Sequence, residues 1–234
     1  MTEQPQVRIG KLMPNWMINL TDRIMQYYID RYLNCDPVVL DRPPEPQPGH
    51  RYLLYAHIPF CKTLCSYCTF HRFLFKEHKA REYFINLRKE MDYVKALGYI
   101  GGGTTTILED ELIRTIEHAR TLFPGIKEVS CETDPLQIAT PTFRNLKGLV
   151  DRMSIGVQSF NDDILKMTER YDKFGSGALI YERLQEALEL FPTTNVDMIF
   201  GFRGQNLEML QRDMDLLVEL NPRQITTYPL MVTS

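Results

Sequence analysis

The chemically most informative feature of the sequence is a group of three cysteines, Cys61, Cys65 and Cys68, in the segment HIPFCKTLCSYCTF. Their spacing is C-x3-C-x2-C. Three thiolates on one loop can bind three irons of a [4Fe–4S] cluster, which leaves the fourth iron free to bind a small molecule. In a reducing compartment such a group indicates metal ligation rather than disulfide bonds.

Two other interpretations of the three cysteines are open. A zinc ion is one, because His57 or His71 could complete a tetrahedral set of donors. A set of thiols without any metal is the other, and the polar neighbours Lys62 and Ser66 disfavour it. Cys35 and Cys131 stand apart from the motif and are interpreted as ordinary buried or half-buried thiols.

Glycines and a carboxylate follow the next two apolar stretches of the chain. The glycines that begin at Gly101 let the backbone approach a ligand, and their amides can receive a carboxylate, although a tight turn would use the same residues. Glu132, in SCETDP, is placed to accept hydrogen bonds from an ammonium group or ribose hydroxyls, or to form a salt bridge on the rim of the fold.

Two more polar side chains stand in apolar surroundings. Asp197 lies inside VDMIFGF, where an unpaired carboxylate is costly, so a ligand hydroxyl, Arg170 or an interior hydrogen-bond network must pair it. Tyr55, in YAHIPFC, is either a ligand contact or an aromatic core residue.

The elements that position these residues alternate between strand and helix. The pattern predicts six strands, each except the last followed by a helix. The strands are predicted at 52–58, at Ile100 with the glycines after it, and at 128–133, 152–157, 196–200 and 224–230; the helices are predicted at 78–97, 108–122, 141–149, 177–190 and 206–219.

This alternation predicts an α/β fold with a parallel sheet and right-handed crossovers. Six repeats favour a partial (βα)6 TIM-like barrel, whose active site lies at the carboxyl ends of the strands. The second strand is unusually short, and we expect residues to be missing near Tyr99-Ile100. The chain stops at Ser234, directly after the sixth strand, and we expect a further C-terminal domain absent from this sequence.

The first part of the chain differs from the rest. An amphipathic helical rhythm covers 16–33, and the proline-rich segment 41–50 predicts an extended linker, so residues 1–50 form an N-terminal helical extension to the barrel at 51–234. The 234 residues include 27 basic and 30 acidic side chains, a net charge of −3, which argues against nucleic-acid binding by bulk charge. No apolar run is long enough to span a membrane, and the polar first residues carry no signal-peptide apolar region, so we expect a cytoplasmic protein.

The sequence resembles the radical S-adenosylmethionine (SAM) enzymes, in which C-x3-C-x-aromatic-C follows the first barrel strand. The segments YAHIPFC, IGGGTTT, CETDP, SIGVQSF and VDMIFGF, with GQ after the last, occur in the order seen in the oxygen-independent coproporphyrinogen oxidase (HemN-like) branch. The resemblance covers about residues 50–231 and implies a barrel of the radical SAM type.

The resemblance also implies roles for individual residues. It implies that the three cysteines bind a [4Fe–4S] cluster, and that Tyr55, Gly102 and Glu132 contact the SAM bound to it. Tyr67 matches the aromatic position that packs against a SAM moiety. In relatives with two SAM molecules, the positions that match a second one are Gly103, Thr104, Gln158, Arg170 and Asp197.

The sequence departs from the coproporphyrinogen oxidases at two positions. Phe70 stands where they have a fourth cysteine, and Arg203 stands where a proline usually precedes GQ. The first departure makes the chain more similar to the HemN-like haem chaperones and two-SAM C-methyltransferases.

Two classes of function follow from the resemblance. In the first, the chain is an enzyme, an oxidoreductase or C-methyltransferase, that cleaves SAM to a 5′-deoxyadenosyl radical and acts on a tetrapyrrole or other conjugated small molecule. In the second, it keeps the cluster but binds and delivers haem. The enzyme would need one or two SAM molecules and a one-electron donor such as flavodoxin or ferredoxin.

Overall fold

The computed structural model describes residues 54–65, 68, 70–93, 99–102 and 105–230, together with the isolated positions 20, 23, 24, 27, 28 and 31. The chain divides into two compact units, 1–44 and 45–234. In the first unit the six described positions are helical and fall within 16–33, where the sequence predicts a helix. The account below concerns the second unit.

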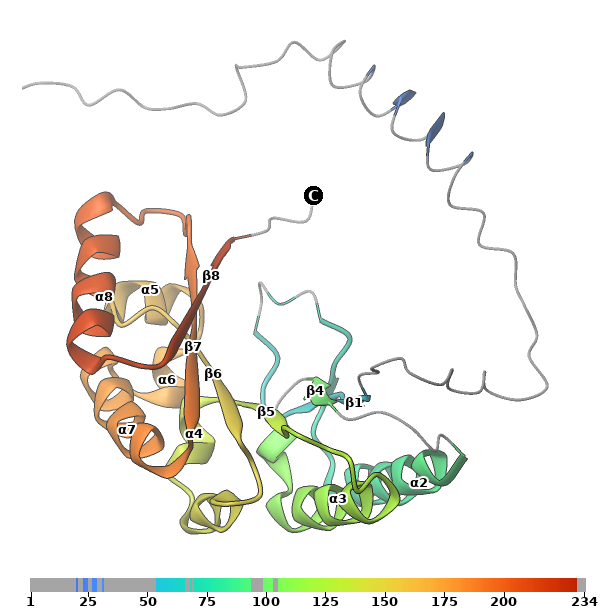
Figure 1. Ribbon diagram of the computed structural model, residues 1–234. Helices are drawn as coiled ribbons and strands as arrows, with labels where there is room; N and C mark the ends of the chain where they lie inside the picture. The colour runs from blue at the N-terminus through green and yellow to red at the C-terminus, as the bar shows by residue number, and fades with distance from the viewer. Residues whose placement is uncertain are drawn as a thin grey trace, which may run out of the picture. The chain divides into compact units, whose positions relative to one another are not determined.

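The second unit is built on six parallel strands, as the sequence predicts (Figure 1). Strand β1 (Tyr55–Ile58) pairs with β4 (Tyr99–Gly102). A four-stranded sheet follows in the order β5 (Ser130–Thr133), β6 (Arg152–Gln158), β7 (Thr193–Phe200) and β8 (Gln224–Pro229). The α/β partial barrel predicted from the alternation is confirmed.

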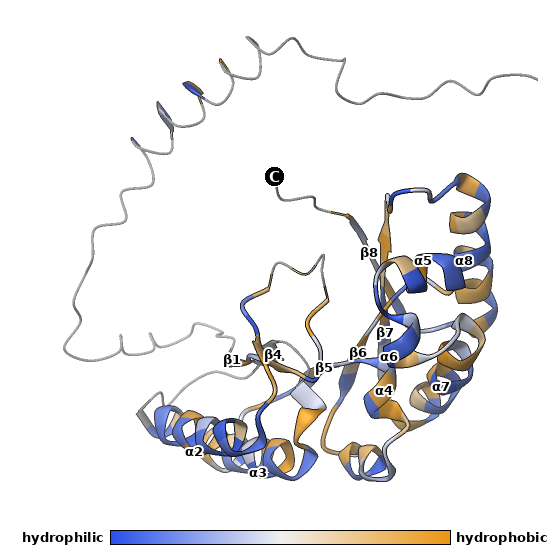
Figure 2. Cartoon of the chain, turned by 180° about the vertical axis from the view of Figure 1, so that it is seen from behind, coloured by the Kyte–Doolittle hydropathy of each residue, from blue (hydrophilic) through white to orange (hydrophobic). Residues whose placement is uncertain are grey.

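Helices connect the strands and cover one face of the sheet. In Figure 1, α2 (Glu77–Tyr93) lies beside α3 (Glu109–Leu122), while α7 (Gly177–Leu190) and α8 (Leu207–Leu220) cover β6 to β8. In Figure 2 these helices alternate between hydrophilic and hydrophobic residues, as amphipathic helices do. Among the described residues, no helix combines the length and the apolar character that a bilayer crossing requires.

Several short elements differ from the sequence prediction. The predicted helix 141–149 is a 3-10 helix, η3 (Pro141–Leu146), because the chain turns at Gly148 with φ 81°. The helices α4 (Pro135–Ile138), α5 (Asp162–Met167) and α6 (Tyr171–Phe174) are too short to give a hydrophobic period, and the pattern predicts none of them. Side-chain caps mark two of them instead: the Asp134 carboxylate accepts from the first amides of α4, and Asn161 caps α5.

The inner and outer faces of the sheet differ in polarity. Met153, Ile155 and Val157 alternate along β6 and are buried in the main hydrophobic core beneath the helices. The residues between them face the opposite side, and Ser154 there meets Asn195 of β7. Strand β7 begins at Thr193 rather than at the predicted Val196. The polar residues Thr194 and Asn195 can lie in the strand because both are buried and have hydrogen-bond partners.

Two threonines join the two parts of the sheet. Within the described residues β4 and β5 do not form a hydrogen-bonded ladder. The short helix η2 (Thr105–Ile107) fills this position. The Thr105 hydroxyl donates to the Glu132 carbonyl at 2.6 Å and accepts from the Glu132 amide at 3.2 Å, while the hydroxyls of Thr106 and Thr133 lie 2.6 Å apart. Both threonines are fully buried, so their hydroxyls replace part of the missing ladder.

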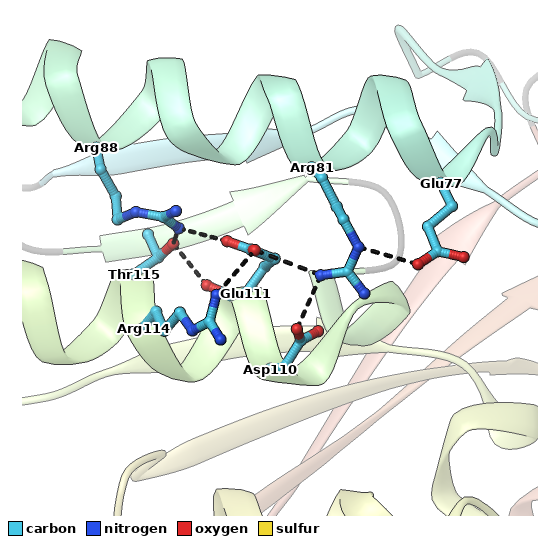
Figure 3. A network of polar contacts seen from close by, with 7 residues as sticks. All are labelled: Glu77, Arg81, Arg88, Asp110, Glu111, Arg114 and Thr115. Carbon is cyan, nitrogen blue, oxygen red and sulfur yellow. Dashed lines mark hydrogen bonds and ion pairs between the residues drawn. The ribbon is translucent and has the colours of Figure 1, made fainter.

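The interface between α2 and α3 contains a buried carboxylate, Glu111 (Figure 3). Its Oε2 lies 2.8 Å from Arg88 Nη1, and its Oε1 lies 3.4 Å from Arg81 Nη1 and 3.3 Å from Arg114 Nη1. The side chain of Arg88 is 19% exposed, whereas those of Arg81 and Arg114 are 39% and 63% exposed. The pair with Arg88 is therefore the one that water screens least.

Replacing Glu111 by Gln should lower the free energy of unfolding by about 1–3 kcal/mol, because the largely buried guanidinium of Arg88 loses its counter-charge. Urea unfolding followed by circular dichroism would measure this change. The matched control is Glu117→Gln on the exposed face of α3, which should change the free energy by less than about 0.5 kcal/mol. Equal effects at the two positions would show that the Glu111 ion pairs contribute nothing.

Candidate functional site

The cysteine loop begins at the carboxyl end of β1. Cys61 ends β2 (Phe60–Cys61), which pairs with β3 (Phe73–Leu74). The Phe73 amide donates to the Pro59 carbonyl at 2.6 Å, and the Phe75 amide donates to the Cys61 carbonyl at 2.9 Å. The two short strands therefore close the base of the loop that carries Cys65 and Cys68.

Arg72 contacts the backbone of the cysteine loop. Its Nη2 donates to the carbonyl of Cys65 at 2.5 Å and to the carbonyl of Cys68 at 2.7 Å. Partial burial lowers the pKa of Arg72, but a hydrogen bond with Cys68 and the charges of all three cysteine side chains raise the pKa by more, so the net shift is upward. The guanidinium group of Arg72 thus contacts the backbone of two of the three cysteines.

The three cysteines of the motif are all partly exposed, and none of them is in a disulfide bond. Across the described part of the chain, no three His, Cys, Asp or Glu side chains already lie together as a metal site. The assignment of a cluster or a zinc ion to these cysteines therefore rests on the spacing of the motif.

The two histidines beside the motif have structural partners. His57 Nε2 lies 2.8 Å from the carbonyl of His71, and His57 Nδ1 lies 2.9 Å from the hydroxyl of Tyr55. Because a carbonyl only accepts, Nε2 carries the proton, and in the neutral ring Nδ1 then accepts from the Tyr55 hydroxyl. The oxygen of Tyr55 keeps its lone pairs for another donor. Burial and then the charge of Glu132 raise the pKa of Tyr55, which keeps it a phenol.

Arg170 and Asp197 lie among different partners. Arg170 is buried; its Nη1 lies 3.9 Å from Cys65 Sγ, and its Nη2 donates to the carbonyl of Gly156. Asp197 accepts from the Ser154 hydroxyl and from the Asn195 amide, both at 2.8 Å. Arg170 and Asp197 therefore each pair with other groups and not with one another.

Gln158 ends β6 in an unusual backbone conformation, with φ 77°. Its Oε1 is buried without a hydrogen-bond partner among the described residues. The turn after it is held by Asp213 of α8, whose carboxylate accepts from the Ser159 hydroxyl at 2.6 Å and from the Phe160 amide at 2.9 Å. This buried carboxylate fixes the direction in which Gln158 leaves the strand.

The remaining predicted site residues either lie on neighbouring strands or fall outside the residues that the structure describes. Gly102 ends β4 opposite Ile58 of β1, and Glu132 lies in β5 opposite Ser154 of β6. Tyr67, Gly103 and Thr104 fall outside the described residues. Cys131, interpreted from the sequence as an ordinary thiol, is fully buried, and burial raises its pKa to about 12; Cys35 is not described.

Three groups at this site are not identified from the residue pattern. Arg72, the network of Ser154, Asn195 and Thr226 around Asp197, and Asp213 are all missed. The available signal in the sequence is a polar residue at an alternate position of an otherwise apolar strand. Ser154 and Asn195 show this pattern. Nothing in the spacing of Arg72 or Asp213 distinguishes them from surface residues.

Comparison with known proteins gives a consistent result. The profile of the Radical SAM superfamily matches residues 55–217. The chain is 31% identical over 191 residues to the heme chaperone HemW of Bacillus subtilis, covering 76% of this chain and 50% of HemW. It is 29% identical over 189 residues to the oxygen-independent coproporphyrinogen III oxidase of Escherichia coli, covering 75% of this chain and 41% of the oxidase.

The solved structure of coproporphyrinogen III oxidase (HemN) from Escherichia coli, a radical SAM enzyme, is similar in fold. The TM-score is 0.70 at 28% identity, covering 79% of this chain and 45% of that one. The chain spans about half the length of the curated relatives it matches, or somewhat less.

The titration of Asp197 gives a testable pH dependence. Burial raises the pKa of Asp197, and hydrogen bonds from Ser154 and Asn195 offset only part of the rise. The folded protein therefore holds this proton to a higher pH than the unfolded chain, and the associated stability is lost as the pH rises from about 4 through the raised pKa. The Tm of Asp197→Asn minus the Tm of the parent should accordingly increase with pH across that range and then become constant.

Thermal unfolding between about pH 4 and 7 would measure this difference. The matched control is Asp172→Asn at an exposed position in α6, whose difference from the parent should stay constant. A constant difference at Asp197 as well would mean that its carboxyl does not titrate as the structure indicates.

Proposed function

The chain belongs to the radical SAM superfamily, and we propose on that premise that it binds a [4Fe–4S] cluster and cleaves SAM reductively. The observation that carries the proposal is the loop with Cys61, Cys65 and Cys68. It leaves the carboxyl end of β1, where the active sites of βα barrels lie, and it offers three thiols for four irons.

The bound cluster would supply one electron to SAM and so generate a 5′-deoxyadenosyl radical. The chain's own residues hold and orient the reactants. The three cysteines would hold three irons. The backbone at Gly102, at the end of β4, has no side chain to keep a ligand away.

Tyr55 and Glu132 would bind the SAM at the cluster. The hydrogen bond between the Tyr55 hydroxyl and His57 turns the phenolic oxygen into an acceptor, which suits the ammonium group of a methionine moiety. Glu132 adds a carboxylate that the Thr105 hydroxyl holds in place through both backbone groups of Glu132. Tyr67 is assigned to the same neighbourhood from the sequence alone.

A second ligand, SAM or substrate, would lie over β6 and β7. The unpartnered Oε1 of Gln158 supports this assignment, because a buried acceptor without a partner is costly unless a ligand satisfies it. Asp197 and Arg170 add opposite charges, and Asn195 and Ser154 orient the carboxylate. Gly103 and Thr104 complete the proposed set from the sequence.

The substrate is proposed to be a tetrapyrrole or another conjugated small molecule, changed by hydrogen abstraction or by methyl transfer from a second SAM. A small redox protein such as flavodoxin or ferredoxin would supply the electron. Cysteines that bind a cluster must stay reduced, and we therefore propose a cytoplasmic protein.

Haem binding and delivery is the second candidate function. The relative at 31% identity is a heme chaperone, and Phe70, which is 74% exposed, replaces the fourth cysteine of the oxidases. The two candidates share the cluster and differ in whether SAM is consumed.

Anaerobic reconstitution should give about four irons per chain with broad absorption near 400 nm. Cys61→Ala, Cys65→Ala and Cys68→Ala should each abolish this absorption, because three thiolates are the minimum for the site. Cys131→Ala and Cys35→Ala are the matched controls and should keep it. Uptake of one zinc ion without iron would refute the cluster.

The second prediction concerns SAM cleavage and the number of SAM molecules that bind. With dithionite and SAM the reconstituted protein should release 5′-deoxyadenosine, and equilibrium dialysis with labelled SAM should give about two SAM per chain, one for each proposed set of contacts. Asp197→Ala should reduce this to about one and keep the cleavage, whereas Asp172→Ala should change neither.

Failure of the parent to cleave SAM, together with stoichiometric haem binding, would favour delivery over catalysis. A single SAM in the parent and in Asp197→Ala alike would refute the second SAM.

A further inference from the structure

Arg72 is a charged side chain that donates to the backbone of the second and third cysteines of the motif, Cys65 and Cys68. It stands four residues after Cys68, and a single nitrogen, Nη2, donates to the carbonyls of Cys65 and Cys68. The loop also has one backbone bond of its own, from the Cys68 amide to the Cys65 carbonyl at 3.2 Å. The Cys65 carbonyl thus receives two donors, and the turn between the two cysteines is closed from both sides.

One nitrogen of the guanidinium group is also held away from water. Arg72 is partly buried, and its Nε is buried without a hydrogen-bond partner among the described residues. A charge held away from water acts more strongly on its neighbours than one on the surface. The side chains of Cys61, Cys65 and Cys68 all lie close enough to interact with it electrostatically.

We propose that Arg72 is the positioning residue of the cluster loop: it holds the carbonyls of Cys65 and Cys68 in place and fixes a positive charge beside the three thiolates. The proposal rests on the cluster assigned under the proposed function. It adds a residue that binds neither iron nor SAM and acts through the three ligands.

Two separate consequences follow. The carbonyl contacts organise the loop before iron arrives, so their loss should weaken retention of the cluster, as loss of residues that orient metal ligands commonly does. The charge favours the reduced cluster, because reduction adds one negative charge to a site already surrounded by thiolates. Reduction potentials of such clusters depend on net charge and hydrogen bonding around the sulfurs. Arg72 should therefore make the potential less negative.

The test compares two variants of the full chain at one pH. Arg72→Gln removes the charge and the guanidinium, and Arg72→Lys keeps the charge but has a shorter side chain without the Nη2 that donates to both carbonyls. The matched control is Arg212→Gln on the exposed face of α8. The readouts are circular dichroism of the apoprotein, iron content after reconstitution, the rate of iron loss to a chelator, and the midpoint potential from electron paramagnetic resonance.

Arg72→Gln should lose iron about tenfold faster or more, and its midpoint potential should be more negative than that of the parent. Arg72→Lys should lose iron faster too but keep the parent's potential. Arg212→Gln should match the parent in every measurement.

Several results would overturn the proposal. An unchanged potential in Arg72→Gln would disprove the role of the charge, and unchanged iron loss in both variants would disprove the role of the carbonyl contacts. Should Arg72→Gln fail to fold, Arg72→Lys still decides, because iron loss as slow as in the parent contradicts the proposal. If the parent protein takes up no iron, the cluster itself is refuted. If the parent binds four irons and the Arg72 variants behave like the parent, only the role of Arg72 is refuted.

Discussion

The hydroxyl of Thr105 is the contact on which the rest of the site depends. It bonds to both backbone groups of Glu132, and so it helps to link the strand pair β1–β4 to the four-stranded sheet where, in the described part of the chain, no ladder connects β4 and β5. The cysteine loop and Tyr55 lie on one side of this contact, and Arg170, Gln158 and Asp197 belong to the other side. Together with the hydrogen bond between the hydroxyls of Thr106 and Thr133, it fixes the register between the two halves of the candidate site.

The two faces of the sheet differ in what they contribute. Alternate residues of β6 and β7 pack under the helices, and the residues between them form a connected polar network around Asp197. A buried carboxylate costs stability, and the hydrogen bonds from Ser154 and Asn195 offset part of that cost for Asp197. The network thus lowers the cost of holding an ionisable group in the interior of the sheet.

The sequence alone predicts the fold well, because six apolar stretches separated by amphipathic helices admit few arrangements. The cysteine motif is also legible from the sequence, since its spacing is local. Contacts between distant segments are not, because Asp213 reaches Ser159 from α8 and Glu111 meets arginines of α2 without any local pattern that predicts them. Arg72 is close to its partners in sequence, but no residue pattern predicts that it folds back onto its own loop. The short helices α4 to α6 are missed because they are too short to give a hydrophobic period, and side-chain caps mark only α4 and α5.

Cys131 sets a limit on where oxygen can damage the molecule. Its thiol is fully buried and has a pKa of about 12, so it is not a thiolate at neutral pH and resists oxidation and alkylation. The partly exposed thiols at the carboxyl end of β1 have no such protection. Within the described part of the chain, cysteine oxidation is therefore expected at the loop with Cys61, Cys65 and Cys68, and Cys131 in the wall of the barrel is spared.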